Sequence, residues 1–241
     1  MSGSNAAKQP PTPENAGIRV QRLYNLLRLF AHQVRNPLTI IKGDMEVGLL
    51  KTRTAEEYQR IMRSNLEEID RIERLTDDVT AVFQAEAGEL KLDRRKLNLN
   101  EMIEGLTEKL RKIASPKGLD LTISPENGIL VIVADQPRLQ QMLTHLIENA
   151  LAFTPEGGRV EVIVEGRENE AWVTIKDQSS GIPPEELPHI FDPFFEGGRQ
   201  NYSALSMSLC KAIAQAHNGS LEISSRTGKD SGTEITVRLP V

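Results

Sequence analysis

Apolar side chains in the first third of the chain recur at the spacing of long amphipathic helices. Residues 18–52 carry a stripe whose first line falls at every seventh position: Val20, Leu27, Val34 and Ile41. A second line runs beside it: Leu23, Phe30, Leu38 and Met45. Residues 53–87 repeat the pattern after a polar break, and Gly88 is a stop signal. The pattern predicts two helices joined by a short turn.

Two such helices form a hairpin with little core of its own. Each arm carries one apolar stripe, and a single antiparallel pair leaves part of both stripes in water. Pairing two hairpins into a four-helix bundle buries the remainder. The sequence therefore predicts a homodimer.

The pattern changes after the hairpin to short apolar strands alternating with helices. We expect helices at residues 100–114, 136–152 and 205–217. We expect strands at residues 120–123, 130–133, 159–164, 171–176, 220–223 and 234–239. This order predicts an α+β domain with a mixed sheet behind the helical hairpin.

Composition narrows the choice of partner and compartment. The 241 residues carry 29 Lys and Arg against 34 Asp and Glu, a formal charge of −5, so no nucleic-acid partner is expected. Cys210 is the only cysteine, which excludes a disulfide framework and favours a cytoplasmic location. The longest apolar runs are far shorter than the roughly 20 residues that cross a bilayer, so no membrane span is expected. Residues 1–16 look like a linker or a cloning remnant.

His32 stands on the helix face turned away from the apolar stripe. With Leu27 and Val34 at heptad position a, His32 takes position f, which points into solvent. Pro37 follows inside the same helical pattern, where it removes a backbone hydrogen bond at a cost of about 3 kcal/mol. A lone surface histidine is most often only solvated, but one beside a costly proline is a candidate functional group.

The segment around His32 resembles a known motif. Residues 30–41 read Phe-Ala-His-Gln-Val-Arg-Asn-Pro-Leu-Thr-Ile-Ile, similar to the sensor histidine kinase phosphoacceptor motif His-(Glu/Asp)-x-x-(Thr/Asn)-Pro-Leu. The resemblance implies that His32 is phosphorylated and that Gln33 and Asn36 are its catalytic neighbours. Gln33 replaces an acidic residue, and an amide hydrogen-bonds but does not accept a proton at neutral pH.

A second segment, residues 135–155, resembles the asparagine-containing helix of the same family. By this resemblance Asn149 supplies an amide oxygen to the Mg²⁺ that the triphosphate of ATP holds. Two polar positions differ from the family: His145 replaces a common asparagine, and Ala152 stands where a Lys or Arg often reaches the phosphates. Taken alone, Asn149 is also compatible with a helix-surface amide, but the Asn-Ala and Thr-Pro pairs around it favour the ligand.

Two further segments resemble the adenine-binding boxes of the family. Residues 173–183 read Val-Thr-Ile-Lys-Asp-Gln-Ser-Ser-Gly-Ile-Pro, which is similar to the family motif Asp-x-Gly-x-Gly-Ile. The resemblance implies that the Asp177 carboxylate accepts a hydrogen bond from the adenine amino group. Gly181 lets the backbone approach the ring, whereas Ser179 replaces the first glycine and adds bulk. In the final box, Gly-Thr-Glu-Ile-Thr-Val-Arg-Leu-Pro, the hydroxyl of Thr233 backs that carboxylate.

The nucleotide lid of the family has a partial counterpart. Residues 190–195 read Ile-Phe-Asp-Pro-Phe-Phe, which resembles the aromatic box at the base of the family's nucleotide lid. By this resemblance Phe195 is a nucleotide-binding candidate. Leu205 and Ser208 match the Gly-x-Gly-Leu-Gly-Leu-Ser motif that follows. Side chains stand at its three glycine positions: Tyr202, Ala204 and Ser206. Side chains there intrude on the phosphate space and restrict positive φ.

The resemblance implies a phosphoacceptor hairpin at residues 17–88, a linker at 89–97 and an ATP-binding α/β sandwich of the Bergerat type at 98–241. Its expected reaction moves the ATP γ-phosphoryl to His32 and then to an aspartate of a response-regulator receiver domain, with ATP and Mg²⁺ as cofactors.

Two alternatives stay open. A catalytically degenerate phosphorelay or scaffold protein of the same fold would bind response regulators without using ATP. The altered nucleotide-site positions and Gln33 favour it. A gyrase- or chaperone-type ATPase is disfavoured by the hairpin with its histidine motif.

Overall fold

The computed structural model describes residues 13–193, 195 and 204–241, and of residues 13–20 and 22 it describes only the backbone. The chain divides into two compact units between Val79 and Thr80. Among the described residues, no helix is both long and apolar enough to cross a membrane.

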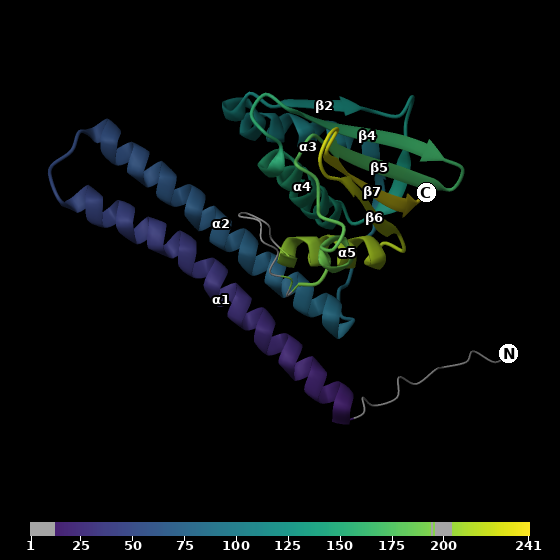
Figure 1. The fold of residues 1–241 in the computed structure, drawn as a ribbon, viewed down its shortest axis with the longest axis horizontal. Helices are drawn as coiled ribbons and strands as arrows, with labels where there is room; N and C mark the ends of the chain where they lie inside the picture. The colour runs from purple at the N-terminus through teal and green to yellow at the C-terminus, as the bar shows by residue number, and fades with distance from the viewer. Residues whose placement is uncertain (1–12, 194, 196–203) are drawn as a thin grey trace. The chain divides into compact units, whose positions relative to one another are not determined.

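The first unit is built from two long helices, the second of which continues past the boundary into the second unit. Helix α1 (Pro13–Leu49) and helix α2 (Ala55–Ala87) are joined by residues 50–54, and Figure 1 shows them running antiparallel. Thr54 and Glu57 form a capping box: the Glu57 backbone N–H donates to Thr54 Oγ1 at 3.3 Å, and the Thr54 N–H donates to Glu57 Oε2 at 3.0 Å. The predicted hairpin is confirmed.

Burial in the hairpin follows a line one position away from the expected stripe. Leu26 is only 1% exposed, and Pro37 and Gly48 are buried as well, whereas Leu27 is 55% exposed. Helix α1 runs through Pro37 without interruption. The outward-facing apolar side chains are between 41% and 62% exposed: Leu27, Leu38, Met45, Met62, Leu66 and Ile69. One hairpin therefore leaves these apolar side chains in water.

The second unit contains a five-stranded mixed sheet in the order β2-β4-β5-β7-β6. Its strands are β2 (Asp120–Ser124), β4 (Arg159–Arg167), β5 (Glu170–Asp177), β7 (Gly232–Pro240) and β6 (Ser220–Arg226). Strand β2 pairs parallel with β4, and the other pairs are antiparallel. The predicted strands and the mixed sheet are confirmed.

A separate two-stranded sheet pairs β1 (Arg95–Asn98) with β3 (Val131–Ala134). The sequence pattern predicted β3 but not β1, which begins inside the segment interpreted as a linker. Strand β1 has only four residues and one large apolar side chain, Leu97, so it carries no alternation that a pattern could reveal.

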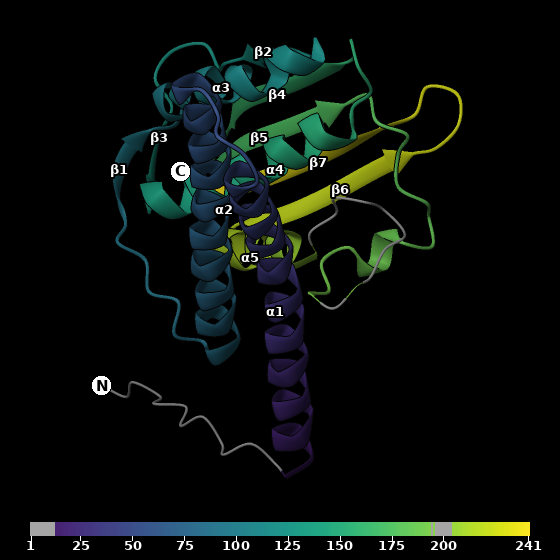
Figure 2. The same cartoon turned by 90° about the vertical axis from the view of Figure 1, so that its left-hand side faces the viewer.

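Three helices pack on one face of the larger sheet, as Figures 1 and 2 show: α3 (Leu99–Ala114), α4 (Gln136–Phe153) and α5 (Ala204–Ala216). Two short 3₁₀ turns, η1 (Ser115–Lys117) and η2 (Leu187–His189), complete the unit. The helix faces and the sheet enclose large side chains that are at most 1% exposed: Leu99, Ile103, Leu139, Leu143, Leu146, Ile147 and Ile175. The α/β sandwich of the prediction is confirmed.

A network of hydrogen bonds centred on Asp135 joins the segment before β1 to α4 and to His217 at the end of α5. Asp135 caps α4: its Oδ1 accepts from the Arg138 N–H at 3.1 Å, and its Oδ2 accepts from the Asp93 N–H at 2.8 Å. The Asp135 N–H donates to Nε2 of the buried His217 at 3.0 Å, and His217 Nδ1 lies 2.9 Å from the Ile213 carbonyl. These partners fix a neutral tautomer with the proton on Nδ1.

Burial lowers the pKa of His217, and the charge of Arg94 acts in the same direction. The hydrogen bond to Ile213 and the charge of Asp135 oppose that shift without reversing it. The neutral form is therefore the one that the folded unit favours.

Candidate functional site

A small cavity opens between α4 and the sheet of the second unit, with a volume of about 40 Å³. Its walls are mostly apolar, with four polar side chains among them: Asn149, Asp177, Ser179 and Thr233. Its apolar lining comes from five elements or loops: Ala150, Phe153, Ile182, Ile190, Met207, Ile223 and Ile235. Three of the predicted nucleotide-binding residues, Asn149, Asp177 and Thr233, therefore meet in one place.

The Asp177 carboxylate is held in a fixed orientation at the end of β5. Its Oδ1 accepts two backbone hydrogen bonds, from the Ser179 N–H at 2.9 Å and the Thr233 N–H at 3.0 Å. Charge-assisted bonds of this kind are roughly twice as strong as neutral ones. The carboxylate is thus preorganised to accept a further hydrogen bond in the cavity.

Three hydroxyl groups are linked around Thr233, the residue whose backbone N–H bonds to this carboxylate. Thr233 Oγ1 lies 2.9 Å from Ser225 Oγ and 3.4 Å from Ser179 Oγ. Ser225 on β6 also donates to the Gly232 carbonyl at 2.9 Å and accepts from the Ile182 N–H at 2.7 Å. Sequence reasoning missed Ser225, because a serine within a strand carries no distinguishing signal.

Ser179 is buried, with 2% exposure, and its hydroxyl accepts from the Gly181 N–H at 3.3 Å. The residue that replaces the family's glycine is thus bonded into its own loop while it also lines the cavity.

Gly181 and Gly232 occupy positions that no other residue fits. Gly181 has φ +77°, and a Cβ built there would collide with the backbone carbonyl of Arg226. A Cβ on Gly232 would collide with the carbonyl of Asp177. Both glycines let two backbone segments approach closely beside the carboxylate, which places Gly181 next to the cavity without lining it.

The first turn of α5 packs against α4 at the other end of the cavity. Asn149 Nδ2 donates to the Met207 sulfur at 3.3 Å, and Met207 is 2% exposed. Ala204 and Ser206, at two of the family's glycine positions, are buried helical residues without positive φ. Both side chains are thus accommodated in ordinary helical backbone. Tyr202 lies outside the described residues.

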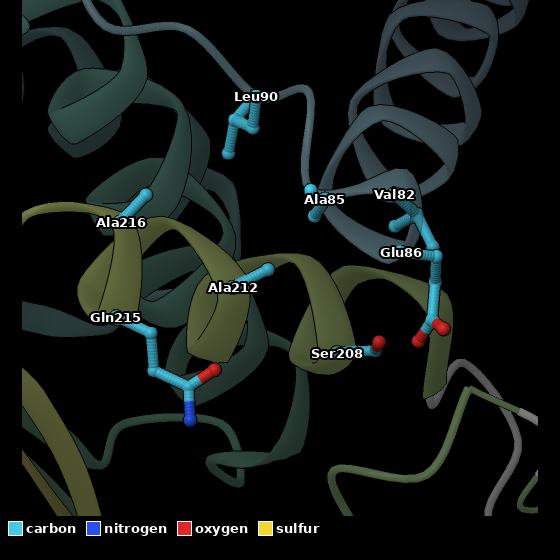
Figure 3. A pocket seen from close by; sticks show the side chains of 9 residues that line it. Val82, Ala85, Glu86, Leu90, Ser208, Ala212, Gln215 and Ala216 are labelled. Atoms are coloured by element: carbon cyan, nitrogen blue, oxygen red, sulfur yellow. The ribbon is translucent and has the colours of Figure 1, made fainter. Parts of the chain in front are cut away.

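The remaining lid residues do not line the cavity. Leu205 is 1% exposed in the core, and Phe195 stacks on His189 with ring centroids 5.9 Å apart. Ser208 lies on the opposite side of α5, in a separate pocket of about 380 Å³ (Figure 3). Two other positions that differ from the family lie on α4, where His145 is half-buried and Ala152 is exposed.

His32 and Asn36 are exposed on α1, and Gln33 is half-buried. At 100° per residue, Leu38 and Met45 lie within about 20° of Leu27 around the helix axis, whereas His32 lies about 140° away. The histidine therefore projects from a different face of α1 than Leu27, Leu38 and Met45. This agrees with its expected position outside the seam.

Among the described residues, no group of three or more His, Cys, Asp and Glu side chains could hold a metal ion. The amide oxygen of Asn149 is a hard ligand of the type that Mg²⁺ accepts, and Mg²⁺ is commonly shared between one or two protein oxygens and substrate phosphates. Asn149 fits that kind of shared site.

Two family models match the chain. Residues 22–88 match the His Kinase A (phospho-acceptor) domain, and residues 134–241 match the histidine kinase-, DNA gyrase B- and HSP90-like ATPase domain. Histidine protein kinase DivJ of Caulobacter vibrioides is 33% identical over 221 residues, which are 88% of this chain and 36% of DivJ. Sensor histidine kinase HprS of Escherichia coli is 30% identical over 203 residues, covering 83% of this chain and 44% of HprS. The chain thus spans less than half of these relatives.

Solved structures share the fold. The catalytic domain of histidine kinase ThkA has a TM-score of 0.57 at 25% identity, covering 62% of this chain and 96% of that domain. Histidine kinase AdeS of Acinetobacter baumannii has a TM-score of 0.65 at 20% identity, covering 87% of this chain and 97% of AdeS. With both domain models matched in order, an exposed histidine on the hairpin and a carboxylate-based cavity in the sandwich, the chain belongs to the sensor histidine kinases of two-component systems.

Proposed function

We propose that this chain is the catalytic core of a histidine kinase, which transfers the γ-phosphoryl group of ATP to His32 and passes it to an aspartate of a response-regulator receiver domain. The observation that carries the proposal is the Asp177 carboxylate, fixed by two backbone N–H groups inside an apolar cavity. The matched ATPase and phospho-acceptor models support it.

Adenine recognition follows from the chemistry of that cavity. A carboxylate oxygen accepts more than one hydrogen bond, so Asp177 receives the exocyclic amino group of adenine while its Oδ1 keeps the two backbone donors. The isoleucines of the walls cover the faces of the ring. Thr233 and Ser225 hold the carboxylate in place.

The phosphate end lies beside Asn149 and the first turn of α5. The N-terminus of a helix favours anions because its first N–H groups have no intrahelical acceptor. Asn149 would hold Mg²⁺ through its amide oxygen, and the ion when bound neutralises charge on the phosphate oxygens.

In the transfer step, an imidazole nitrogen of His32 attacks the γ-phosphorus, the bond from that phosphorus to the β–γ bridging oxygen breaks, and ADP leaves with that oxygen. The attacking nitrogen supplies its lone pair, and the N–H proton of the phosphorylated ring passes to solvent, because the Gln33 amide does not accept it. Gln33 instead orients the ring by hydrogen bonding. The receiver aspartate then attacks the phosphorus, the P–N bond breaks, and the imidazole leaves in its neutral form after its ring takes up a proton from solvent.

Two partners follow from the faces of the hairpin. A second copy of the chain covers the exposed apolar face around Leu38 and Leu66, which gives a homodimeric four-helix bundle. The receiver domain binds the face that carries His32. A ThkA chain solved in complex with the response regulator TrrA has this fold, with a TM-score of 0.66 at 24% identity, 92% of this chain and 63% of that chain being covered.

One observation favours the second candidate, a scaffold that binds response regulators without using ATP. The cavity of about 40 Å³ is much smaller than the roughly 300 Å³ at which ligand pockets begin. This candidate predicts no nucleotide binding.

The test is incubation of the chain with Mg²⁺ and ATP labelled at the γ-phosphate. We expect label that is lost in acid and kept in base, as for a phosphorus–nitrogen bond. His32→Ala abolishes the label, and ATP labelled at the α-phosphate gives none. A purified receiver domain then removes label from the chain. No label with γ-labelled ATP would favour the scaffold.

A further inference from the structure

Met207 lies where a bound adenine nucleotide needs space. Its side chain is 2% exposed and lines the same cavity as Asp177 and Thr233. Its sulfur accepts the hydrogen bond from Asn149 Nδ2 at 3.3 Å. One side chain of α5 thus touches the residue proposed for Mg²⁺ and fills the space beside the residue proposed for adenine.

The volume of the cavity makes this placement consequential. About 40 Å³ is far below the roughly 300 Å³ at which ligand pockets begin. A purine ring enters only if a lining side chain moves. The isoleucines at four of the lining positions are β-branched and stiff at χ1. Methionine is unbranched and has three rotatable side-chain bonds, so Met207 is the lining residue best able to move.

We propose that Met207 sets the nucleotide affinity of this chain: its side chain has to leave the cavity, and release Asn149, before the nucleotide binds. The inference rests on the proposed function, since it concerns the same site. Base entry and the release of the Asn149 amide then occur together, because one side chain controls both. The bulk of Met207 is the main obstacle, because a thioether is only a weak hydrogen-bond acceptor.

The substitution Met207→Ala removes this obstacle. We expect the full chain carrying it to bind Mg-ADP at least about tenfold more tightly than the unchanged chain, measured by calorimetric titration. Met207→Leu keeps most of the volume and removes the sulfur, so its affinity stays near that of the unchanged chain. Met142→Ala is the matched control: Met142 is 0% exposed on α4 and does not line the cavity, so its loss leaves the affinity unchanged or weaker.

A second measurement needs no substitution. With the methionine methyl groups isotopically labelled, the NMR signal of the Met207 methyl shifts on saturation with Mg-ADP, while that of Met142 stays in place. A Met207 signal that does not move while Mg-ADP binds would overturn the inference.

The possible failures are distinguishable. If folded Met207→Ala binds Mg-ADP no more tightly than the unchanged chain, and Asp177→Asn weakens binding by both about a hundredfold, the inference is wrong and the nucleotide site remains. If neither chain binds Mg-ADP, the proposed function itself is wrong, and the inference fails with it.

Discussion

The hairpin differs from the second unit in how much apolar surface it covers by itself. The second unit, residues 80–241, is called the nucleotide unit below. In the hairpin, the large apolar side chains of one face are 41% to 62% exposed, while Leu26 and Val79 are among the few that are buried. In the nucleotide unit, three helices and a sheet enclose a core whose apolar members are at most 9% exposed. Two helices can share only one seam, whereas helices on a sheet enclose their apolar faces from two sides.

This difference agrees with the proposed dimer, in which a second hairpin covers the face that one hairpin leaves exposed. The exposed face around Leu38 lies about 120° from His32 around the axis of α1. A second hairpin can therefore cover the apolar face without covering the histidine. Completion of the fold and access to the phosphoacceptor are compatible because they use different faces.

The largest expected effect comes from placing negative charges on the exposed apolar face of the hairpin. Leu38→Glu with Leu66→Glu should convert a dimer to monomers, because both side chains are more than half exposed within one chain. Burial of each leucine contributes about 1.5–3 kcal/mol to dimer stability, and a dimer buries four of them. The dissociation constant of the dimer therefore rises by more than about a thousandfold. Light scattering gives the mass. Leu50→Glu at the hairpin turn, where Leu50 is 81% exposed, is the control and keeps the dimer. A double variant with dimer mass would place the interface elsewhere.

The second prediction concerns the nucleotide unit. Asp177→Asn should weaken Mg-ADP binding by about a hundredfold, because an amide nitrogen facing the adenine amino group leaves a buried donor unpaired. Titration calorimetry measures it. Glu170→Gln on the same strand is the control. Glu170 accepts an exposed hydrogen bond from Trp172, so this substitution should leave the Mg-ADP affinity unchanged. Equal affinity of the Asp177→Asn and unchanged chains would contradict adenine recognition by this carboxylate.

The third prediction is a pH dependence of the nucleotide unit. The pKa of His217 is lowered in the folded state, so its contribution to stability is complete above the unfolded pKa of about 6.5 and is lost as pH falls below it. The free energy of unfolding should decrease by at most about 1.4 kcal/mol per pH unit from this group. Urea unfolding at pH 7.5 and 5.5 measures the change.

His217→Gln should reduce that pH dependence, whereas His189→Gln, at an exposed histidine, should preserve it. If the unchanged chain and His217→Gln show the same pH dependence of the unfolding free energy, His217 is not its source.

The smallest expected effect is local to the hairpin. Thr54→Ala removes the capping box of α2 and should cost about 1 kcal/mol, which is roughly a fivefold faster hydrogen exchange in the first turn of α2. Thr52→Ala, at an exposed threonine of the same turn, should leave exchange unchanged. Equal exchange rates in the two variants would show that the cap contributes nothing.

The sequence predicts most of the fold because its signals are local. The helices of the hairpin follow from apolar spacing, and the strands of the larger sheet follow from runs of Val, Ile and Leu. Strand β1 at Arg95–Asn98 escapes prediction because four mostly polar residues are strands only through their pairing with β3. The burial of Leu26 in place of Leu27 likewise depends on how the second helix packs.

The site is predictable only in part, because some of its contacts join distant segments. Asp177, Asn149 and Thr233 carry motif signals, and the structure brings them to one cavity. Ser225 carries none, and the Asp135–His217 bond joins residues 82 positions apart. Met207 looks like an ordinary core residue of α5 until its contact with Asn149 is seen. Ser208 matches a motif but faces a different pocket.

The central claim is that His32 receives a phosphoryl group from ATP bound beside Asp177. The most direct measurement is peptide mapping by mass spectrometry after incubation with Mg-ATP, with digestion kept at neutral or basic pH. The account predicts one phosphoryl group on His32, absent from His32→Ala and strongly reduced in Asp177→Asn. A phosphoryl group on another side chain, or modification that persists in His32→Ala, would contradict it.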